Sequence, residues 1–210
     1  MTPPLPPTLA TVAPPLPAPP DGPVLRFDPE LLLRAQGQGG GVRVALFDVD
    51  GVLTDGRLYI GEAGEVFKAF HVLDGHGIKL LAACGIEPVV VTGRDSPAVR
   101  RRLADLGVRH AAFGAGDKLA AATPLLATLG VDWTDVAAIG DDWPDLPLLQ
   151  RAAVAVAPPG AHPEIRARVH HVTTAAAGQG AAREFCDLLL TAAGHYARLL
   201  QAHGGSLDTR

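Results

Sequence analysis

The fold is decided by one stretch of the chain, VRVALFDVDGVLTD at residues 42–55. Its first half is apolar and rich in valine, which predicts a buried strand over residues 42–48. Asp48 and Asp50 close this strand, and Gly51 lets the chain turn sharply after them. A buried strand that ends in two carboxylates and a tight turn predicts a ligand site at the edge of a sheet.

Strands and helices alternate regularly on the C-terminal side of this stretch. Short apolar runs predict further strands at residues 57–60, 65–72, 87–91, 110–113, 135–139, 153–156 and 169–172. Apolar residues at helical spacing, bounded by Ser, Asp, Pro and Gly, predict helices at residues 29–36, 77–84, 97–106, 117–129, 146–151 and 181–200. The alternation predicts an α/β fold, a mostly parallel sheet with helices on both faces, into which residues 57–72 insert a small β-hairpin.

Composition limits the classes of protein to which the chain can belong. Its 210 residues, 48% of them hydrophobic, suffice for one compact domain, which we expect over residues 26–205. A net charge of −4 and a pI near 6.0 argue against nucleic acid or an anionic membrane as partner. No apolar run has the length of a membrane span, and no basic residue precedes Arg26 as a signal peptide requires. We therefore expect a cytoplasmic protein.

The N-terminal segment differs from the rest of the chain. Eleven of the 19 prolines lie at or before Pro29, and residues 1–25 contain little besides Pro, Leu, Ala and Thr. Proline lacks the backbone donor that helices and sheets need, so we expect an extended tail. A proline-rich ligand for a partner domain is the alternative interpretation of the same composition.

Polar clusters follow four of the predicted strands, which brings them to one edge of the sheet. They comprise Asp48–Asp55, Thr92–Arg94, Asp117–Lys118 and Gly140–Asp145. Each cluster alone has an ordinary explanation, such as a surface turn or acids at a helix start. Together, in this order and at these positions, they predict a single site for an anionic ligand.

These residue types fit the transfer of a phosphoryl group. A carboxylate nucleophile is repelled by phosphate oxygens unless a cation intervenes, and Mg²⁺ prefers oxygen ligands. We expect Asp48 and Asp141 to hold Mg²⁺ through carboxylates, with the Asp50 carbonyl as a further ligand. Asp48 would attack phosphorus, while Asp50 would protonate the leaving alcohol and then deprotonate water. Thr92 and Lys118 would stabilise the transferring oxygens.

The four clusters match the four motifs of the haloacid-dehalogenase-like phosphatases. From about Pro29 to Leu200 the chain resembles one branch of them, the 3-deoxy-D-manno-octulosonate 8-phosphate phosphatases. The segments that carry the resemblance are residues 48–56, 74–78, 92–94, 114–118, 140–145, 161–163 and 180–184.

The resemblance implies a Rossmann-like core without a large cap domain, and the segment between Asp55 and the helix at 77–84 is indeed too short for one. It also implies a homotetramer in which the hairpins over residues 57–72 meet and a neighbouring subunit closes each active site. The implied partner is a small anionic sugar-acid phosphate. We expect substrate contacts from Gly51, Asp55, Gly93, Arg94, His71 and His76. For the two histidines, a structural role is the alternative.

Two departures from the family pattern concern the substrate. Leu73 and Gln179 stand where the family usually has arginines, the residues best suited to grip a carboxylate or phosphate. A different sugar phosphate, including one of the sialic-acid type, is therefore an alternative substrate.

Other classes of protein share parts of this pattern. Receiver domains of signalling proteins also place Asp, Thr, Lys and acidic Mg²⁺ ligands at strand ends, but they lack an acid two residues after the acceptor, so Asp50 favours an enzyme. An inactive scaffold and a phosphomutase are the remaining alternatives, although a phosphomutase usually needs a mobile cap.

Overall fold

The computed structural model describes residues 23–37 and 41–204 and contains one central sheet. Its six strands lie in the order β5-β4-β1-β6-β7-β8, and every neighbouring pair is parallel. They are β1 (Val44–Phe47), β4 (Glu87–Val91), β5 (His110–Ala112), β6 (Val136–Ile139), β7 (Val154–Ala157) and β8 (His171–Val172). The predicted α/β fold is confirmed. The tail expected over residues 1–25 falls almost entirely outside the described residues.

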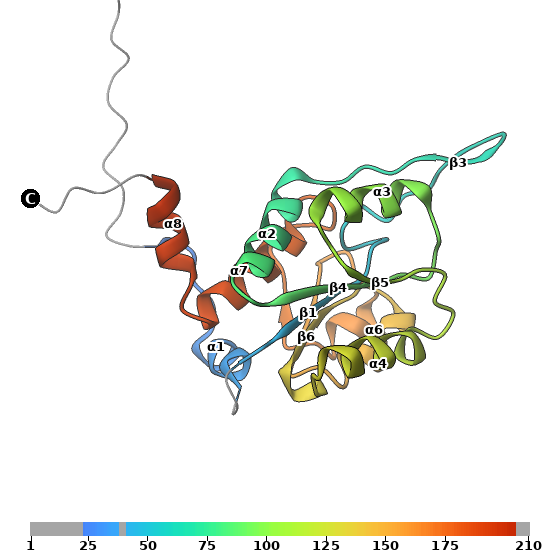
Figure 1. Ribbon diagram of the computed structural model, residues 1–210. Coiled ribbons are helices and arrows are strands. Elements are labelled where there is room, and N and C mark those ends of the chain that lie inside the picture. The colour runs from blue at the N-terminus through green and yellow to red at the C-terminus, as the bar shows by residue number, and fades with distance from the viewer. Residues whose placement is uncertain (1–22, 38–40, 205–210) are drawn as a thin grey trace, which may run out of the picture.

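Helices cover both faces of this sheet (Figure 1). One face carries α1 (Pro29–Gln36), α2 (Val72–Ala83), α3 (Pro97–Leu106) and α7 (Ala181–Ala192). The other carries α4 (Lys118–Leu129), α5 (Leu146–Leu149) and α6 (Pro163–Arg166). Strand β1 serves both layers, because Phe47 packs under α7 and Leu46 belongs to the opposite core. Such two-sided burial requires the unbroken apolar sequence of β1.

A second, two-stranded sheet projects from the body of the protein (Figure 1). It is the hairpin of β2 (Tyr59–Gly61) and β3 (Gly64–Phe67), which pair antiparallel. The strand predicted over residues 65–72 is therefore too long, since it ends at Phe67 and Val72 already begins α2.

Helix α2 begins at Val72, five residues before the predicted start at residue 77. The glycines near this start do not form a loop. Gly75 and Gly77 are instead sites of close helix packing. A β-carbon on Gly75 would lie 2.3 Å from an Arg102 guanidinium nitrogen on α3, and one on Gly77 would lie 3.0 Å from Cys186 on α7. The absence of side chains lets three helices approach one another.

The C-terminal helix predicted over residues 181–200 is two helices. Helix α7 ends at Ala192, and α8 (Tyr196–Gly204) follows after Gly194, whose φ of 73° lies in the left-handed region. The apolar spacing continues across this break, so periodicity alone did not reveal it. Among the residues described, none of the helices has the length and apolar character required to span a bilayer.

The contact between Phe185 of α7 and Phe47 of β1 should make a large contribution to stability. Both rings are fully buried and meet edge to face, with centroids 5.3 Å apart. We expect Phe185→Ala to reduce the free energy of unfolding by about 3–5 kcal/mol, because it leaves a cavity under the sheet. Leu33→Ala on α1 is the control, since Leu33 is 66% exposed. Urea denaturation of both variants measures the free energy of unfolding. Equal losses in the two variants would contradict the large contribution of the Phe185–Phe47 contact.

Candidate active site

The site lies in an open cleft of about 370 Å³ at the carboxyl ends of the central strands. Asp48 and Asp50 follow β1, Thr92 follows β4, and Asp141 follows β6. The backbone fixes these positions, since the Asp48 amide donates to Ile139 of β6 (3.1 Å) and the Thr92 amide donates to Ala112 of β5 (3.0 Å). The cleft is lined by Asp48, Asp50, Thr92, Gly93, Arg94, Ala115, Gly116, Lys118, Asp141, Asp142, Pro144 and Asp145.

Lys118, the first residue of α4, is the cationic centre of the site. Its ammonium donates hydrogen bonds to Asp48 Oδ1 and to Asp145 Oδ1, each at 2.6 Å. The side chains of all three residues are at most 6% exposed. Asp117 caps α4 by accepting from the Ala120 amide at 3.0 Å, and this cap fixes the start of the helix that carries Lys118.

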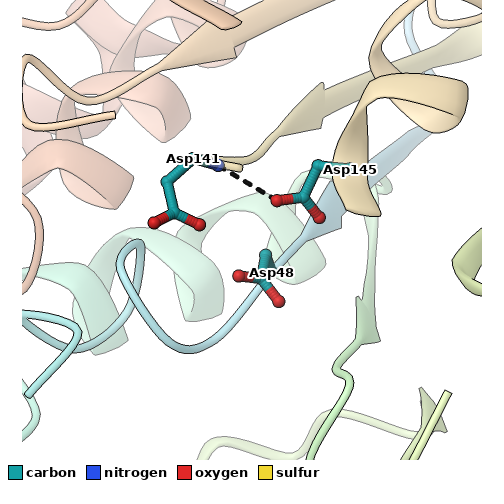
Figure 2. A group of neighbouring side chains, drawn as sticks. All are labelled: Asp48, Asp141 and Asp145. Atoms are coloured by element: carbon teal, nitrogen blue, oxygen red, sulfur yellow. Dashed lines mark hydrogen bonds between the residues drawn. The ribbon is translucent and has the colours of Figure 1, made fainter. Parts of the chain in front are cut away.

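Three carboxylates gather at this site (Figure 2). Oxygens of Asp48, Asp141 and Asp145 lie within 4.8 Å of one another. Burial and the neighbouring Asp145 raise the pKa of Asp48 to about 8, and the same two causes raise the pKa of Asp141 to about 6. Burial opposes the charge on Lys118, but the two carboxylates raise its pKa overall. The cluster therefore carries an excess of negative charge.

A hard divalent cation fits this donor set. Carboxylate oxygens at this spacing match the ligands that Mg²⁺ takes in proteins. Gly51 shapes the same place, because its φ is 89° and a β-carbon there would lie 2.0 Å from Asp141 Oδ2. Any residue other than glycine would displace the Asp141 carboxylate.

Asp145 is a site residue to which the sequence analysis assigned no role. One of its oxygens accepts from Lys118, and the other accepts from the amides of Asp141 (3.1 Å) and Asp142 (3.2 Å). Figure 2 shows the bond to the Asp141 amide. Asp145 thus holds both the lysine and the loop that carries Asp141. The four-residue spacing of the two acids after a predicted strand was the available signal.

Asp50 lies at the edge of the cleft, with its side chain 21% exposed. Its carboxylate contacts Lys68, which follows the hairpin, with Nζ 2.5 Å from Oδ1. Arg94 lies on the other side, 3.9 Å from Oδ2 and half exposed. Seven of the predicted site residues therefore line one cleft: Asp48, Asp50, Thr92, Gly93, Arg94, Lys118 and Asp141.

Three of the expected substrate contacts lie elsewhere in this subunit. His76 lines a different cavity, between α2, α7 and α8, where its ring meets His203 edge to face at 5.6 Å. His71 precedes α2, and among the described residues its buried Nδ1 has no hydrogen-bond partner. Asp55 accepts from the Arg57 amide at 3.0 Å and does not line the cleft. Within one subunit, the cleft is complete without these three side chains.

Comparison with known proteins places this site in a family. The family model for haloacid dehalogenase-like hydrolases matches residues 113–185. The 3-deoxy-D-manno-octulosonate 8-phosphate phosphatase KdsC of Escherichia coli K12 is 43% identical over 166 residues, which cover 79% of this chain and 87% of that enzyme. The chain belongs to this phosphatase family.

Solved structures of family members share the fold. The phosphatase from Yersinia pestis superimposes with a TM-score of 0.76 at 40% identity, covering 80% of this chain and 89% of that one. The phosphatase from Moraxella catarrhalis, solved with magnesium, phosphate and KDO, gives a TM-score of 0.78 at 35% identity, covering 84% of this chain and 98% of that one. The haloacid-dehalogenase-like, capless fold expected from the sequence is confirmed.

The raised pKa values predict how a metal ion will affect stability. Because the folded protein holds protons on Asp48 and Asp141 that the unfolded chain releases, these groups stabilise the fold at low pH, and their contribution is lost as pH rises from about 4 to about 8. A metal needs the ionised ligands, so its affinity should rise across the upper part of this range.

We therefore expect Mg²⁺ to raise the melting temperature more at pH 8 than at pH 6. A tenfold gain in affinity adds about 1.4 kcal/mol, or about 3–6 °C for a chain of this size. Thermal melts with and without Mg²⁺ at both pH values measure this, with Asp141→Asn as the control that should show little increase. An equal or larger increase at pH 6 would contradict the assignment of the ligands.

Proposed function

We propose that this chain is a Mg²⁺-dependent phosphomonoesterase that hydrolyses 3-deoxy-D-manno-octulosonate 8-phosphate through an aspartyl phosphate on Asp48. The observation that carries the proposal is the position of Asp48, which lies between the Lys118 ammonium and the Asp141 carboxylate at the floor of an open cleft. A nucleophile so placed faces phosphate oxygens whose charge the site can neutralise.

The metal would be held by the carboxylates of Asp48 and Asp141, with the Asp50 carbonyl as a further ligand. When bound, Mg²⁺ supplies positive charge that offsets the repulsion between Asp48 and the phosphate oxygens. Lys118 adds a second positive charge, and the Thr92 hydroxyl adds a hydrogen-bond donor at the wall of the cleft.

Hydrolysis then proceeds in two displacements at phosphorus. The Asp48 carboxylate forms a bond to phosphorus as the bond to the sugar oxygen breaks, and the Asp50 carboxyl gives its proton to that oxygen. In the second step water attacks the phosphorus, Asp50 takes a proton from the water, and phosphate leaves with Asp48 regenerated. Asp145 keeps Lys118 in place throughout.

The chemistry of the cleft supports an acidic sugar as the substrate. Arg94 lies at the entrance with its side chain 47% exposed, and it can meet a carboxylate on a substrate whose phosphate lies at Asp48. Leu73, which replaces a usual family arginine, is 52% exposed at the start of α2. Because that arginine is missing, the phosphate of a different sugar acid, including one of the sialic-acid type, is the second candidate for the substrate.

A substrate panel separates these candidates. We expect kcat/KM to be highest for 3-deoxy-D-manno-octulosonate 8-phosphate, lower for a sialic acid 9-phosphate, and lowest for glucose 6-phosphate, which lacks the carboxylate. Phosphate release is the measurement. A preference for the neutral sugar would contradict the acidic substrate, and a chain that stays phosphorylated without turnover would support a receiver-like module instead.

Replacement of the two acids after β1 tests the mechanism. We expect Asp48→Asn to abolish turnover, because it removes the attacking charge, while Asp50→Asn slows kcat by about 10²–10⁴-fold, as is typical for loss of an acid or base. Asp105→Asn is the control, because Asp105 is an exposed residue of α3 that does not line the cleft. Steady-state kinetics decide the matter. An Asp48→Asn variant with a tenth of wild-type activity would show that another group is the nucleophile.

We also propose that the hairpin brings subunits together in a homotetramer. Ile60, Val66 and Phe67 are 62%, 66% and 51% exposed, which is more apolar surface than an isolated ribbon keeps in water. Phe67 stacks on Tyr59 at 4.3 Å, so the two rings form one apolar face. Phe70, which follows the hairpin, is not part of this surface, because it packs against the core of its own subunit. The cytoplasmic location stays a prediction.

Phe67→Asp should split this assembly and lower activity, since it puts a charge into the proposed interface without changing any residue of the cleft. Glu62→Ala at the hairpin turn is the control and should leave both properties unchanged. Light scattering and kinetics on the two variants are the measurements. A fully active wild-type monomer would rule out the tetramer as a requirement for catalysis.

A further inference from the structure

The Asp50 carboxylate is one member of a ring of four alternating charges. Lys68 Nζ lies 2.5 Å from Asp50 Oδ1 and 3.1 Å from Glu65 Oε2. Arg94 closes the ring, with guanidinium nitrogens 3.9 Å from Asp50 Oδ2 and 3.9 Å from Glu65 Oε2. Two of the members, Glu65 and Lys68, belong to the hairpin segment and have no place in the mechanism described above.

The burial of Lys68 shows that this arrangement is specific. Its side chain is only 1% exposed, although Lys68 directly follows the projecting hairpin. A buried ammonium needs anionic partners that accept its hydrogen bonds. Among the described residues, those partners are Asp50 and Glu65. Lys68 does not line the cleft, so it reaches the chemistry only through Asp50.

Ser96 holds Glu65 in position. Ser96 precedes α3 in an extended conformation, as a helix cap does, but its side chain makes no capping bond. Its hydroxyl instead donates to Glu65 Oε1 at 2.5 Å. This hydrogen bond, with help from Lys68, lowers the pKa of Glu65, which favours the charged form that pairs with Lys68. Ser96 thus binds the hairpin segment and does not cap α3 through its side chain.

We propose that Lys68 is a positioning residue for Asp50, and that Glu65 and Ser96 hold Lys68 for this task. The inference rests on the proposed function, in which Asp50 passes a proton to the leaving oxygen and later takes one from water. Misplacement of such a group by an ångström lowers the rate strongly. The charge of Glu65 offsets that of Lys68, so the lysine orients Asp50 while the pair adds no net charge.

The ring also links the hairpin to the chemistry within one subunit. The exposed apolar face of the hairpin ends at Phe67, and the buried Lys68 follows it directly. A shift of the hairpin would move the ammonium away from Asp50. The hairpin therefore has a function in its own active site, beside any contact with a neighbouring subunit.

A double-mutant cycle tests the inference, with p-nitrophenyl phosphate as the probe because its turnover does not depend on which sugar acid is the natural substrate. We expect Lys68→Met to lower kcat about 10–100-fold with little change in KM, since Lys68 touches Asp50 and not the substrate. In an Asp50→Asn background the same change should lower kcat by less than about twofold, because its target is already lost. Lys79→Met, at an exposed lysine of α2, is the matched control in both backgrounds.

The outcomes are distinct. Equal losses from Lys68→Met in both backgrounds would show a merely structural lysine and overturn the inference, while the proposed mechanism would stand. Full activity of Asp50→Asn itself would contradict the mechanism instead. If Lys68→Met fails to fold, Glu65→Gln keeps the acceptor for Ser96 and removes only the charge, so we expect a smaller loss that again disappears in the Asp50→Asn background. If Glu65→Gln left kcat unchanged in the protein that retains Asp50, the inference would be overturned.

Discussion

The buried contact of Lys118 with Asp48 and Asp145 is the interaction on which the rest of the site depends. It joins the end of β1 to the start of α4 and to the turn after β6. A buried ammonium and buried carboxylates are unfavourable unless they meet one another, so the three elements are held at fixed distances. Among the described residues, Asp141 has no cationic partner of its own, and this excess of negative charge prepares the cleft for a metal ion.

Much of this arrangement could be predicted from the sequence, because it follows from the sheet. Parallel strands bring their carboxyl ends to one edge, so Asp48, Thr92, Lys118 and Asp141 had to meet once their strands were recognised. The role of Asp145 could not be predicted, because an acid in a helix turn is common. Only the structure shows that its two oxygens bind Lys118 and the Asp141 amide. Lys68 could not be predicted for another reason. The local sequence of a β-hairpin does not show that the lysine after it turns inward toward Asp50.

The errors in secondary structure have the same origin. Gly75 and Gly77 disfavour a helix by their local propensity, but contacts with α3 and α7 require them there. Gly194 ends α7 although the apolar pattern runs on. In each case a contact between distant segments, or a single backbone conformation, overrode the local signal. His76 was assigned to the substrate by its nearness in sequence to the site, whereas its helix turns it toward α8.

The separation of the site residues along the chain has a consequence for synthesis on the ribosome. Lys118 comes 70 residues after Asp48, and translation at about 5–20 residues per second delivers it roughly 4–14 s later. Throughout that interval β1, an apolar strand meant for the centre of a sheet, has emerged without its later neighbour β6. A nascent chain in this state has an open edge on β1, where β6 will pair, and an Asp48 without its Lys118 partner. The cleft can therefore form only after the second half of the chain has been made.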